Sequence, residues 1–257
     1  MESEILKVDD LSYSYHTLTG ETAALSHISF SVREGEFLAI VGPSGCGKST
    51  ILSLIAGLLT PSSGGITFYG KNGQKPGIGY MLQHDHLFEW RDIWKNVTLG
   101  LEINHCMTPE NLERVRRMFD DYGLSAFIHK KPTELSGGMK QRAALIRTMA
   151  LEPDILLLDE PFSALDYQTR LTVSADIAHI IRQAGKTAIL ITHDLSEAIS
   201  LADRVLVLSP RPAHVKAEFP ISLTLPDNSL LAARKTPEYG NYFNQIWEEL
   251  SDESKQK

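Results

Sequence analysis

The stretch Gly42-Pro-Ser-Gly-Cys-Gly-Lys48-Ser-Thr50 decides the fold. It follows a continuous apolar run, Phe37 to Val41, and opens a segment with helical spacing, from Lys48 to Leu59. A strand, a glycine loop and a helix in this order bring backbone N–H groups, a helix N-terminus and the Lys48 amine to one anion. The pattern G-x-x-x-x-G-K-[ST] in this context predicts a loop that binds nucleotide phosphates, with the Ser49 hydroxyl as a ligand of Mg²⁺. The residues expected at the phosphates are Gly42, Pro43, Ser44, Gly45, Cys46, Gly47, Lys48, Ser49 and Thr50.

Two carboxylates follow the apolar run Ile155 to Leu158. In open α/β sheets, ligands bind at the C-terminal ends of such buried strands. We expect Asp159 to join the magnesium shell, and Glu160 to orient and deprotonate an attacking water as a catalytic residue. An acidic pair after a strand is also typical of a helix N-cap region, and these two residues alone leave that alternative open.

The rest of the chain predicts an α/β fold, a P-loop NTPase core with a mixed or parallel sheet. Alternating apolar residues at 5–15 and 27–32 indicate antiparallel strands separated by a turn at 19–21. Short strands are also expected at 66–69, 78–82, 188–191 and 205–208, and helices at 111–122, 139–150, 171–183, 195–202 and 242–250. We expect a nucleotide-binding core at 1–84 and 151–221, a helical insertion at 85–150, and a short C-terminal tail at 222–257 that frays at its end.

Composition narrows the class of protein. The 257 residues are 42% hydrophobic and 22% charged, which is typical of a folded globular chain. With 25 basic and 32 acidic residues the net charge is −7, so a nucleic-acid partner is disfavoured. Two cysteines are too few for a disulfide framework. The acidic start of the sequence predicts no secretory signal, and the apolar runs are too short to span a membrane.

The segment Leu135-Ser-Gly-Gly-Met-Lys-Gln-Arg142 closely resembles the signature motif of ATP-binding cassette (ABC) proteins. Met139 replaces the usual glutamine, a departure that leaves the phosphate contacts of Ser136 and the glycine amides in place. A serine and two glycines at a helix start form a second anion site, made of Ser136, Gly137 and Gly138. One ATP already bound at Lys48 does not need that second site within the same chain.

Further landmarks of the same family occur in the expected order across residues 4–210. The resemblance implies that Gln83, which follows a strand, contacts Mg²⁺ and the attacking water, and that His193 is catalytic. It also places an aromatic residue on the adenine, for which we favour Tyr15. Tyr13 lies on the same strand face, so it remains an alternative for that role.

By this resemblance the protein is the ATPase subunit of an ABC transporter, with ATP and Mg²⁺ as cofactors. Two copies would pair head to tail, with each ATP between Lys48 of one copy and Ser136 of the other. The partners implied are the second copy, an integral membrane permease and, indirectly, an extracytoplasmic solute-binding protein. The subunit would then be peripheral, at the cytoplasmic face of the membrane. The segments 87–91, 161–166 and 242–247 are similar to the nitrate, sulfonate, taurine and bicarbonate branch of bacterial importers, and they do not identify the solute.

Two other functions remain as alternatives. A soluble ABC-type ATPase in DNA repair or translation would normally carry coiled-coil insertions, zinc-binding cysteines or a second cassette, and this sequence shows none of them. A small-molecule kinase would require a phosphoryl acceptor other than water, whereas Glu160, His193 and the signature favour water.

Two further hypotheses concern Cys46 and the segment from Leu87 to Trp94. The amide-rich loop around Cys46 is expected to favour a thiolate when no nucleotide is bound. Alternatively, Cys46 is simply a small residue that the loop tolerates. The segment from Leu87 to Trp94 crowds large rings beside Arg91, a composition typical of interface hot spots, and is expected to contact the permease. The alternative is that these rings pack inside the helical part of the protein.

Overall fold

The computed structural model describes residues 3–17, 20–70, 73–224 and 230–251. The chain forms two compact units. The first comprises Met1–Pro76 and Ile181–Lys257, and the second comprises Gly77–Ile180. The helices expected at 85–150 all lie in the second unit, and the division into core, insertion and tail stays a prediction. Within the described ranges, no helix combines the length and the apolar character needed to cross a membrane.

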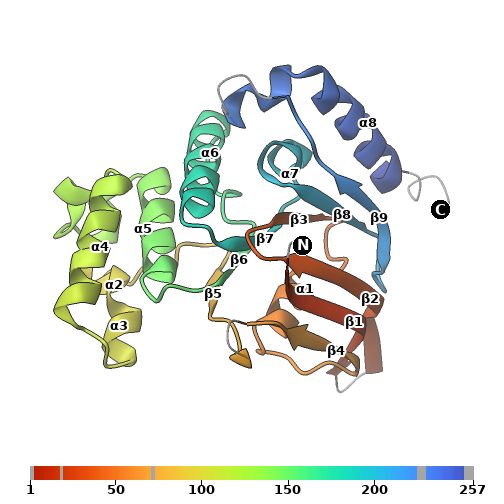
Figure 1. Ribbon diagram of the computed structural model, residues 1–257, viewed down its shortest axis with the longest axis horizontal. Helices are drawn as coiled ribbons and strands as arrows, with labels where there is room; N and C mark the ends of the chain where they lie inside the picture. Colours follow the sequence, from red (N-terminus) through yellow and green to blue (C-terminus); the bar gives the residue numbers. More distant parts are fainter. Residues whose placement is uncertain (1–2, 18–19, 71–72, 225–229, 252–257) are drawn as a thin grey trace. The chain divides into compact units, whose positions relative to one another are not determined.

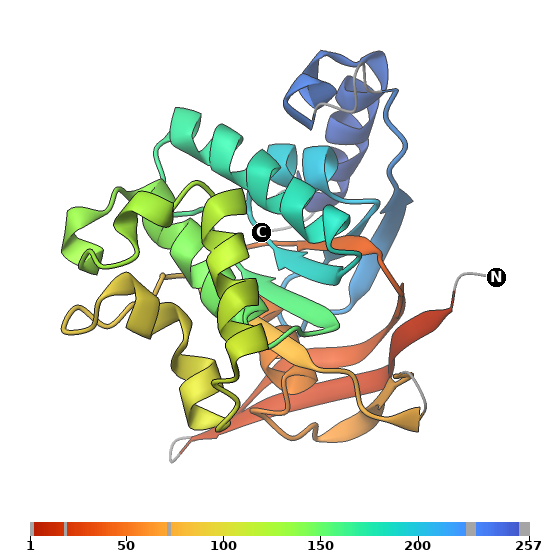
Figure 2. The same cartoon turned by 60° about the vertical axis from the view of Figure 1, so that its left-hand side comes forward.

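An antiparallel sheet forms the N-terminal part of the first unit, and its strands are drawn in red and orange (Figures 1 and 2). It contains β1 (Glu4–Thr17), β2 (Gly20–Arg33) and β4 (Ser63–Phe68), in the order β2-β1-β4. The predicted antiparallel region is therefore confirmed, with longer strands. Of the predicted turn, residue 19 lies outside the described residues, and residues 20 and 21 already belong to β2.

A mixed sheet follows in the first unit, where β7 (Thr187–Ile191), β3 (Phe37–Val41), β8 (Arg204–Leu208) and β9 (Val215–Pro220) lie side by side in that order. The pairs β3–β7 and β3–β8 are parallel, and β9 is antiparallel to β8. Every residue of β3 and β7 is buried, as expected for strands covered on both faces. The strand β9 was not predicted, because its six residues alternate weakly and end in Pro220.

The helices of the first unit are α1 (Lys48–Ile55), α7 (Leu195–Leu201) and α8 (Pro237–Ser251), preceded by a 3₁₀ turn at Leu230–Lys235. The prediction that α1 extends to residue 59 was wrong. Gly57 adopts φ +76°, and the amides of Gly57 and Leu58 donate to the carbonyls of Leu54 and Ser53. This pairing is a Schellman motif, which ends a helix. The helix α8 begins five residues before the predicted start, with Pro237 in its first turn.

The second unit combines two parallel strands with helices. The strands are β5 (Ile78–Met81) and β6 (Ile155–Asp159). The helices are α2 (Ile93–Val97), α3 (Leu99–Ile103), α4 (Pro109–Asp121), α5 (Gly137–Met149) and the start of α6 (Tyr167–Gln183), with 3₁₀ turns at Ser125–Phe127 and Pro132–Glu134. Thr108 caps α4 and Ser136 caps α5 through their side-chain oxygens. The helices predicted at 111–122 and 139–150 correspond to α4 and α5, each of which begins two residues earlier than predicted, whereas α2 and α3 were not predicted.

Candidate functional site

The phosphate loop lies between β3 and α1, as predicted. Lys48 is only 6% exposed, and its Nζ donates to the carbonyl oxygens of Gly42 at 2.8 Å and Pro43 at 3.0 Å. These bonds hold the ammonium group against the loop. A buried cation held by neutral carbonyls keeps its full charge available for an anion.

One feature of the loop requires glycine, and another feature favours an anion. Gly47 has φ +125°, and a Cβ there would lie 2.7 Å from Leu25 Cδ2. No side chain caps the N-terminus of α1, and its first turn contains no acidic residue. The first amides of α1 are therefore oriented toward the loop with the positive end of the helix dipole behind them, which is the arrangement that binds phosphate.

Of the two tyrosines considered for the adenine contact, Tyr15 contacts α1, the helix that follows the phosphate loop. The Tyr15 hydroxyl is 2.9 Å from Thr50 Oγ1 on α1, and the residue Tyr15 is 38% exposed. Tyr13 is half-buried and meets Tyr15 edge-on, with ring centroids 4.9 Å apart. The hydrogen bond to Thr50 links Tyr15 to the helix that carries Lys48, and the choice of Tyr15 over Tyr13 for the adenine stays a prediction.

Arg211 is a loop contact that the sequence reading missed. Its Nη2 donates to the carbonyl of Gly45 at 2.7 Å. Arg211 follows β8, which is the parallel neighbour of β3. A basic residue just after a neighbouring parallel strand was the available signal, because such residues gather at the ligand-binding edge of the sheet.

The predicted thiolate at Cys46 was wrong. The side chain is buried, and this burial raises the pKa of the thiol above its ordinary value of 9.0. The nearby charges of Lys48 and Arg211 lower the pKa by less than burial raises it. Cys46 therefore remains a protonated thiol at neutral pH and acts as a small packed residue of the loop.

His193 lies beyond the C-terminal end of β7, and its side chain is exposed. The turn around it is fixed, because Asp194 N–H donates to Thr192 Oγ1 at 3.0 Å and Asp194 Oδ1 accepts from Ser196 N–H at 2.8 Å. β7 pairs directly with β3, so His193 and the phosphate loop follow neighbouring parallel strands of the first unit. That edge is where α/β sheets bind ligands.

In the second unit, Gln83 and the acidic pair follow β5 and β6, which are also parallel neighbours. Asp159 is buried, and its Oδ2 accepts from the Tyr80 hydroxyl at 3.3 Å. Glu160 is half-buried and has φ +44°, a left-handed conformation that is costly for a residue with a side chain. The Ser163 Oγ donates to the Glu160 carbonyl at 3.0 Å. This strained conformation sets the direction of the Glu160 side chain, and no local sequence pattern predicts it.

The signature segment forms the N-terminus of α5. Ser136 is exposed and accepts from Met139 N–H at 3.4 Å, and the first turn contains no acidic residue. A Cβ on Gly137 would lie 3.0 Å from Leu165 Cδ2, and one on Gly138 would lie 2.9 Å from Val173 Cγ2. The helix start therefore packs too closely for larger residues. An open pocket of about 390 Å³ adjoins it, lined by Ser136, Met139 and Arg142 together with residues of α6.

The segment from Leu87 to Trp94 presents one ring to solvent. Trp90 is 73% exposed and packs against the half-buried Phe88, with ring centroids 4.7 Å apart. Trp94 instead packs on Phe119, with centroids 6.0 Å apart, and on the guanidinium of Arg116. Trp94 thus belongs to the helical packing, as the alternative held, whereas Trp90 lies on the surface.

Known proteins resemble the chain over nearly its whole length. A family model described as "ABC transporter" matches residues 25–163. An uncharacterized ABC transporter ATP-binding protein of Bacillus subtilis, YtlC, is 42% identical over 98% of both chains. The nitrate import ATP-binding protein NrtD of Synechocystis is 40% identical over 94% of this chain and 93% of its own. The taurine import ATP-binding protein TauB of Roseobacter denitrificans is 36% identical, over 95% and 94%.

Among solved structures, the ATP-binding cassette MJ0796, a dimer in a post-hydrolysis state bound to ADP and Pi, matches with a TM-score of 0.71 and 28% identity. The match covers 84% of this chain and 99% of that one. The predicted α/β nucleotide-binding fold and the likeness to the nitrate and taurine branch are both confirmed. The chain belongs to the ABC transporter family, as one of its ATP-binding, ATP-hydrolysing subunits.

Proposed function

We propose that two copies of this chain pair head to tail, and that each ATP lies between Lys48 of one copy and Ser136 of the other. The observation that carries the proposal is that one chain has two glycine-opened helix starts, α1 and α5, and neither has an acidic residue in its first turn. Each start suits a phosphate group. The dimeric cassette MJ0796, bound to ADP and Pi, supports the pairing.

At each ATP, the residues of this chain have separate roles. Glu160 is the general base that orients and deprotonates the attacking water, and His193 is the second catalytic group. Tyr15 stacks on the adenine. In this proposal Ser49, Gln83 and Asp159 provide hydroxyl, amide and carboxylate oxygens for Mg²⁺, and these oxygens are ligands that this ion prefers. Bound Mg²⁺ would neutralise charge on the phosphates. Among the residues that the structure describes, no group of three His, Cys, Asp or Glu side chains could hold a metal alone.

We also propose a role for this chain in transport. Hydrolysis at this dimer drives solute import through a membrane permease, which the subunit contacts at the cytoplasmic face, while an extracytoplasmic binding protein delivers the solute. The exposed Trp90 is the proposed anchor on the permease, because a large ring beside an arginine is typical of interface hot spots. The relatives named for nitrate and taurine import support this role.

The substitution Glu160→Gln tests the catalytic assignment. It removes the general base and keeps the shape of the side chain, so we expect the steady-state ATPase rate to fall by about 10²- to 10⁴-fold. ATP binding should remain. Glu113→Gln, on the exposed face of α4, is the matched control and should leave both quantities unchanged. A Glu160→Gln rate near that of the wild type would contradict the assignment.

The substitution Trp90→Ala tests the link to transport. Because Trp90 is 73% exposed, we expect the isolated variant to keep its melting temperature and its ATP affinity, but to be recovered less well with the permease. Trp247→Ala removes another exposed tryptophan, from α8, and should copurify normally. A Trp90→Ala protein that melts at a lower temperature and copurifies normally would place the ring in the core and the interface elsewhere. Wild-type protein that hydrolyses ATP and binds no permease would favour the non-transport ATPase.

A further inference from the structure

Arg147 connects α5 to the loop that follows Gln83. Its Nη1 donates to the carbonyl of His86 and its Nη2 to the carbonyl of Asp85, both at 2.7 Å. One planar guanidinium thus binds two successive backbone carbonyls, a geometry that lysine cannot reproduce. Burial lowers the pKa of Arg147, and the nearby Asp85 carboxylate opposes that shift. The group nevertheless stays charged, so both bonds are charge-assisted.

The Gln83 loop, residues 83–88, has a defined shape of its own. Asp85 Oδ1 accepts from Leu87 N–H at 2.9 Å, and the Leu87 side chain is buried. His86 has φ +45°, a left-handed backbone conformation that residues other than glycine seldom adopt. The two bonds from Arg147 fall on the strained residue and on the one before it. They therefore stabilise a loop conformation that the local sequence does not favour.

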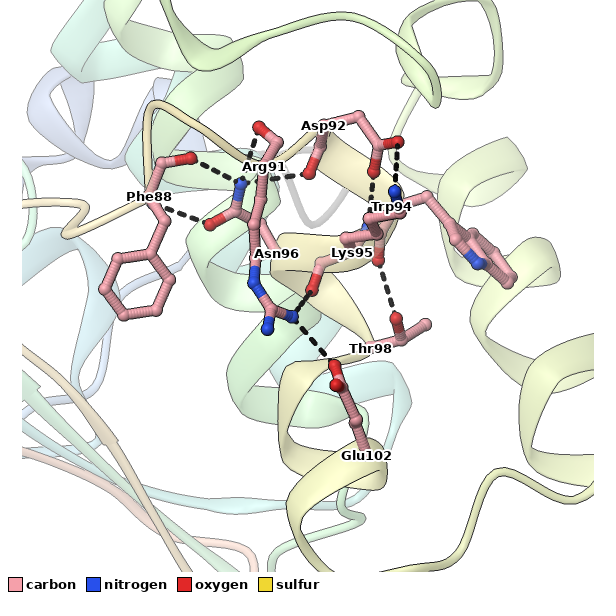
Figure 3. Close-up of polar contacts among 8 residues, drawn as sticks. All are labelled: Phe88, Arg91, Asp92, Trp94, Lys95, Asn96, Thr98 and Glu102. Atoms are coloured by element: carbon pink, nitrogen blue, oxygen red, sulfur yellow. Dashed lines mark hydrogen bonds and ion pairs between the residues drawn. The ribbon is translucent and has the colours of Figure 1, made fainter.

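The other end of the loop is fixed by Asn96 on α2, as Figure 3 shows. Its side-chain Oδ1 accepts from Phe88 N–H at 2.6 Å, and its Nδ2 donates to the Phe88 carbonyl at 3.0 Å. The same Nδ2 also donates to the carbonyls of Arg91 and Asp92. Residues 85–92 are thus held from two helices of the second unit.

The two ends of α5 carry different functional residues, Ser136 at the start and Arg147 near the end. Ser136 caps its N-terminus, and Arg147 lies eleven residues later, about 16 Å along a helix that rises 1.5 Å per residue. The 13 residues of α5 form one continuous helix, and a rigid helix is an element that can carry coupling between its two ends. A displacement at Ser136 therefore reaches the carbonyls of Asp85 and His86, and through them Gln83 two residues earlier in the chain.

We propose that Arg147 is a positioning residue that couples the two ATP sites of the dimer. The inference rests on the proposed function, in which Gln83 contacts the ATP of its own chain and Ser136 contacts the ATP of the partner. Engagement of Ser136 then biases the Gln83 loop in the same chain, so each site responds to the occupancy of the other. Such coupling requires one element that both ligands bias, and the helix α5 with its attached loop provides it.

The test is Arg147→Lys, which keeps the charge and loses the second bond. Arg114→Lys is the matched control, because Arg114 also donates to a backbone carbonyl, that of Ala150 at 3.0 Å, without contacting the loop. The readout is the Hill coefficient of ATP hydrolysis by the full-length protein, which for two sites is at most about 2. We expect a coefficient well above 1 for the wild type and Arg114→Lys, and about 1 for Arg147→Lys. ATP affinity of the single chain should not change.

A second measurement leaves Arg147 intact, for use if its variants do not fold. Ser136→Arg blocks the exposed start of α5, and hydrogen–deuterium exchange then follows the backbone amides of residues 84–88 with ATP in the Glu160→Gln background. We expect ATP to slow their exchange in the parent protein and not in the Ser136→Arg variant. Equal slowing in both proteins would overturn the coupling, as would a Hill coefficient near 1 in the wild type or an unchanged one in Arg147→Lys. Failure of ATP to dimerise Glu160→Gln would instead refute the proposed function.

Discussion

Replacing Asn96 with alanine should loosen the segment that presents Trp90. Asn96 is fully buried and makes four side-chain hydrogen bonds to Phe88, Arg91 and Asp92. The Phe88 carbonyl also accepts from Arg91 N–H at 3.0 Å, and the Asp92 carbonyl from Asn96 N–H at 3.0 Å, so both keep a donor in the variant. The loss therefore falls on the buried contact of the Phe88 N–H and on the Arg91 carbonyl, which both lose their bond to the Asn96 side chain. One unsatisfied group of this kind costs about 1–3 kcal/mol, so we expect a loss near 2 kcal/mol in the free energy of unfolding.

Thermal and urea unfolding measure this loss. For a chain of this size, about 2 kcal/mol lowers the melting temperature by about 4–8 °C. Asn104→Ala is the matched control, because Asn104 is exposed and its side chain makes one bond, to the Gly100 carbonyl at 2.8 Å. It should cost less than about 0.5 kcal/mol. The reasoning fails if the two alanine variants lose the same small amount.

Asn96→Asp separates the acceptor role from the donor role. The introduced carboxylate still accepts from Phe88 N–H, but it faces three carbonyl oxygens that Nδ2 now serves. Burial and these oxygens should raise the pKa of the introduced carboxyl above about 3.9, its value in an unfolded chain. At neutral pH the variant should be less stable than Asn96→Ala. The difference should shrink as the pH falls through the raised pKa, because the protonated acid can donate again. A pH-independent difference would contradict this account.

The remaining predictions concern the loop and the start of α5. Burial raises the pKa of the Cys46 thiol above its ordinary value of 9.0, so iodoacetamide should label Cys46 slowly at neutral pH and readily in denatured protein. Because Cys106 is also a free thiol, the labelled residue is identified by peptide mapping, and rapid labelling of Cys46 in the folded protein at pH 7 would refute this. Gly138→Ala should cost about 1–3 kcal/mol by denaturant titration, because its Cβ would lie 2.9 Å from Val173 Cγ2. Gly240→Ala, with open space around the new Cβ in α8, should instead be neutral or stabilising, and equal losses would refute the packing argument. Arg211→Gln should weaken ATP binding measured by calorimetry with little change in melting temperature, because Arg211 donates to the Gly45 carbonyl of the phosphate loop; unchanged affinity would show that the loop does not need it.

Local patterns predicted most of the fold. The strands β3, β6 and β7 are fully buried and appear as uninterrupted apolar runs. The start of α5 follows from one capping residue, Ser136. The end of α1 was missed because it depends on the left-handed Gly57 and not on the apolar residues that continue to Leu59. The strand β9 was missed because it is an antiparallel addition to β8 with little apolar patterning of its own.

The candidate site was predictable in its residue types and less so in its contacts. The phosphate loop is contiguous in sequence, so its chemistry can be read directly. The strained backbone of Glu160 leaves no trace in residue order. Arg147 and Arg211 bind carbonyls that lie 61 and 166 residues away, and no local pattern records such pairs. The thiolate predicted at Cys46 failed for a related reason, because burial outweighs the charge of the neighbouring Lys48.

A mixture of two complementary variants tests the central claim, that each ATP is shared between two chains. Lys48→Ala and Ser136→Arg, both made in the Glu160→Gln background that blocks hydrolysis, each damage one half of every site in their own homodimers. In a head-to-tail mixed dimer, both defects fall on one site and the other site is intact. The measurement is the mass and the bound ATP of each sample by light scattering and equilibrium binding. We predict monomers for each variant alone, and a mixed dimer that holds one ATP. If the mixture stays monomeric while the Glu160→Gln parent dimerises with ATP, Lys48 and Ser136 do not act across the interface.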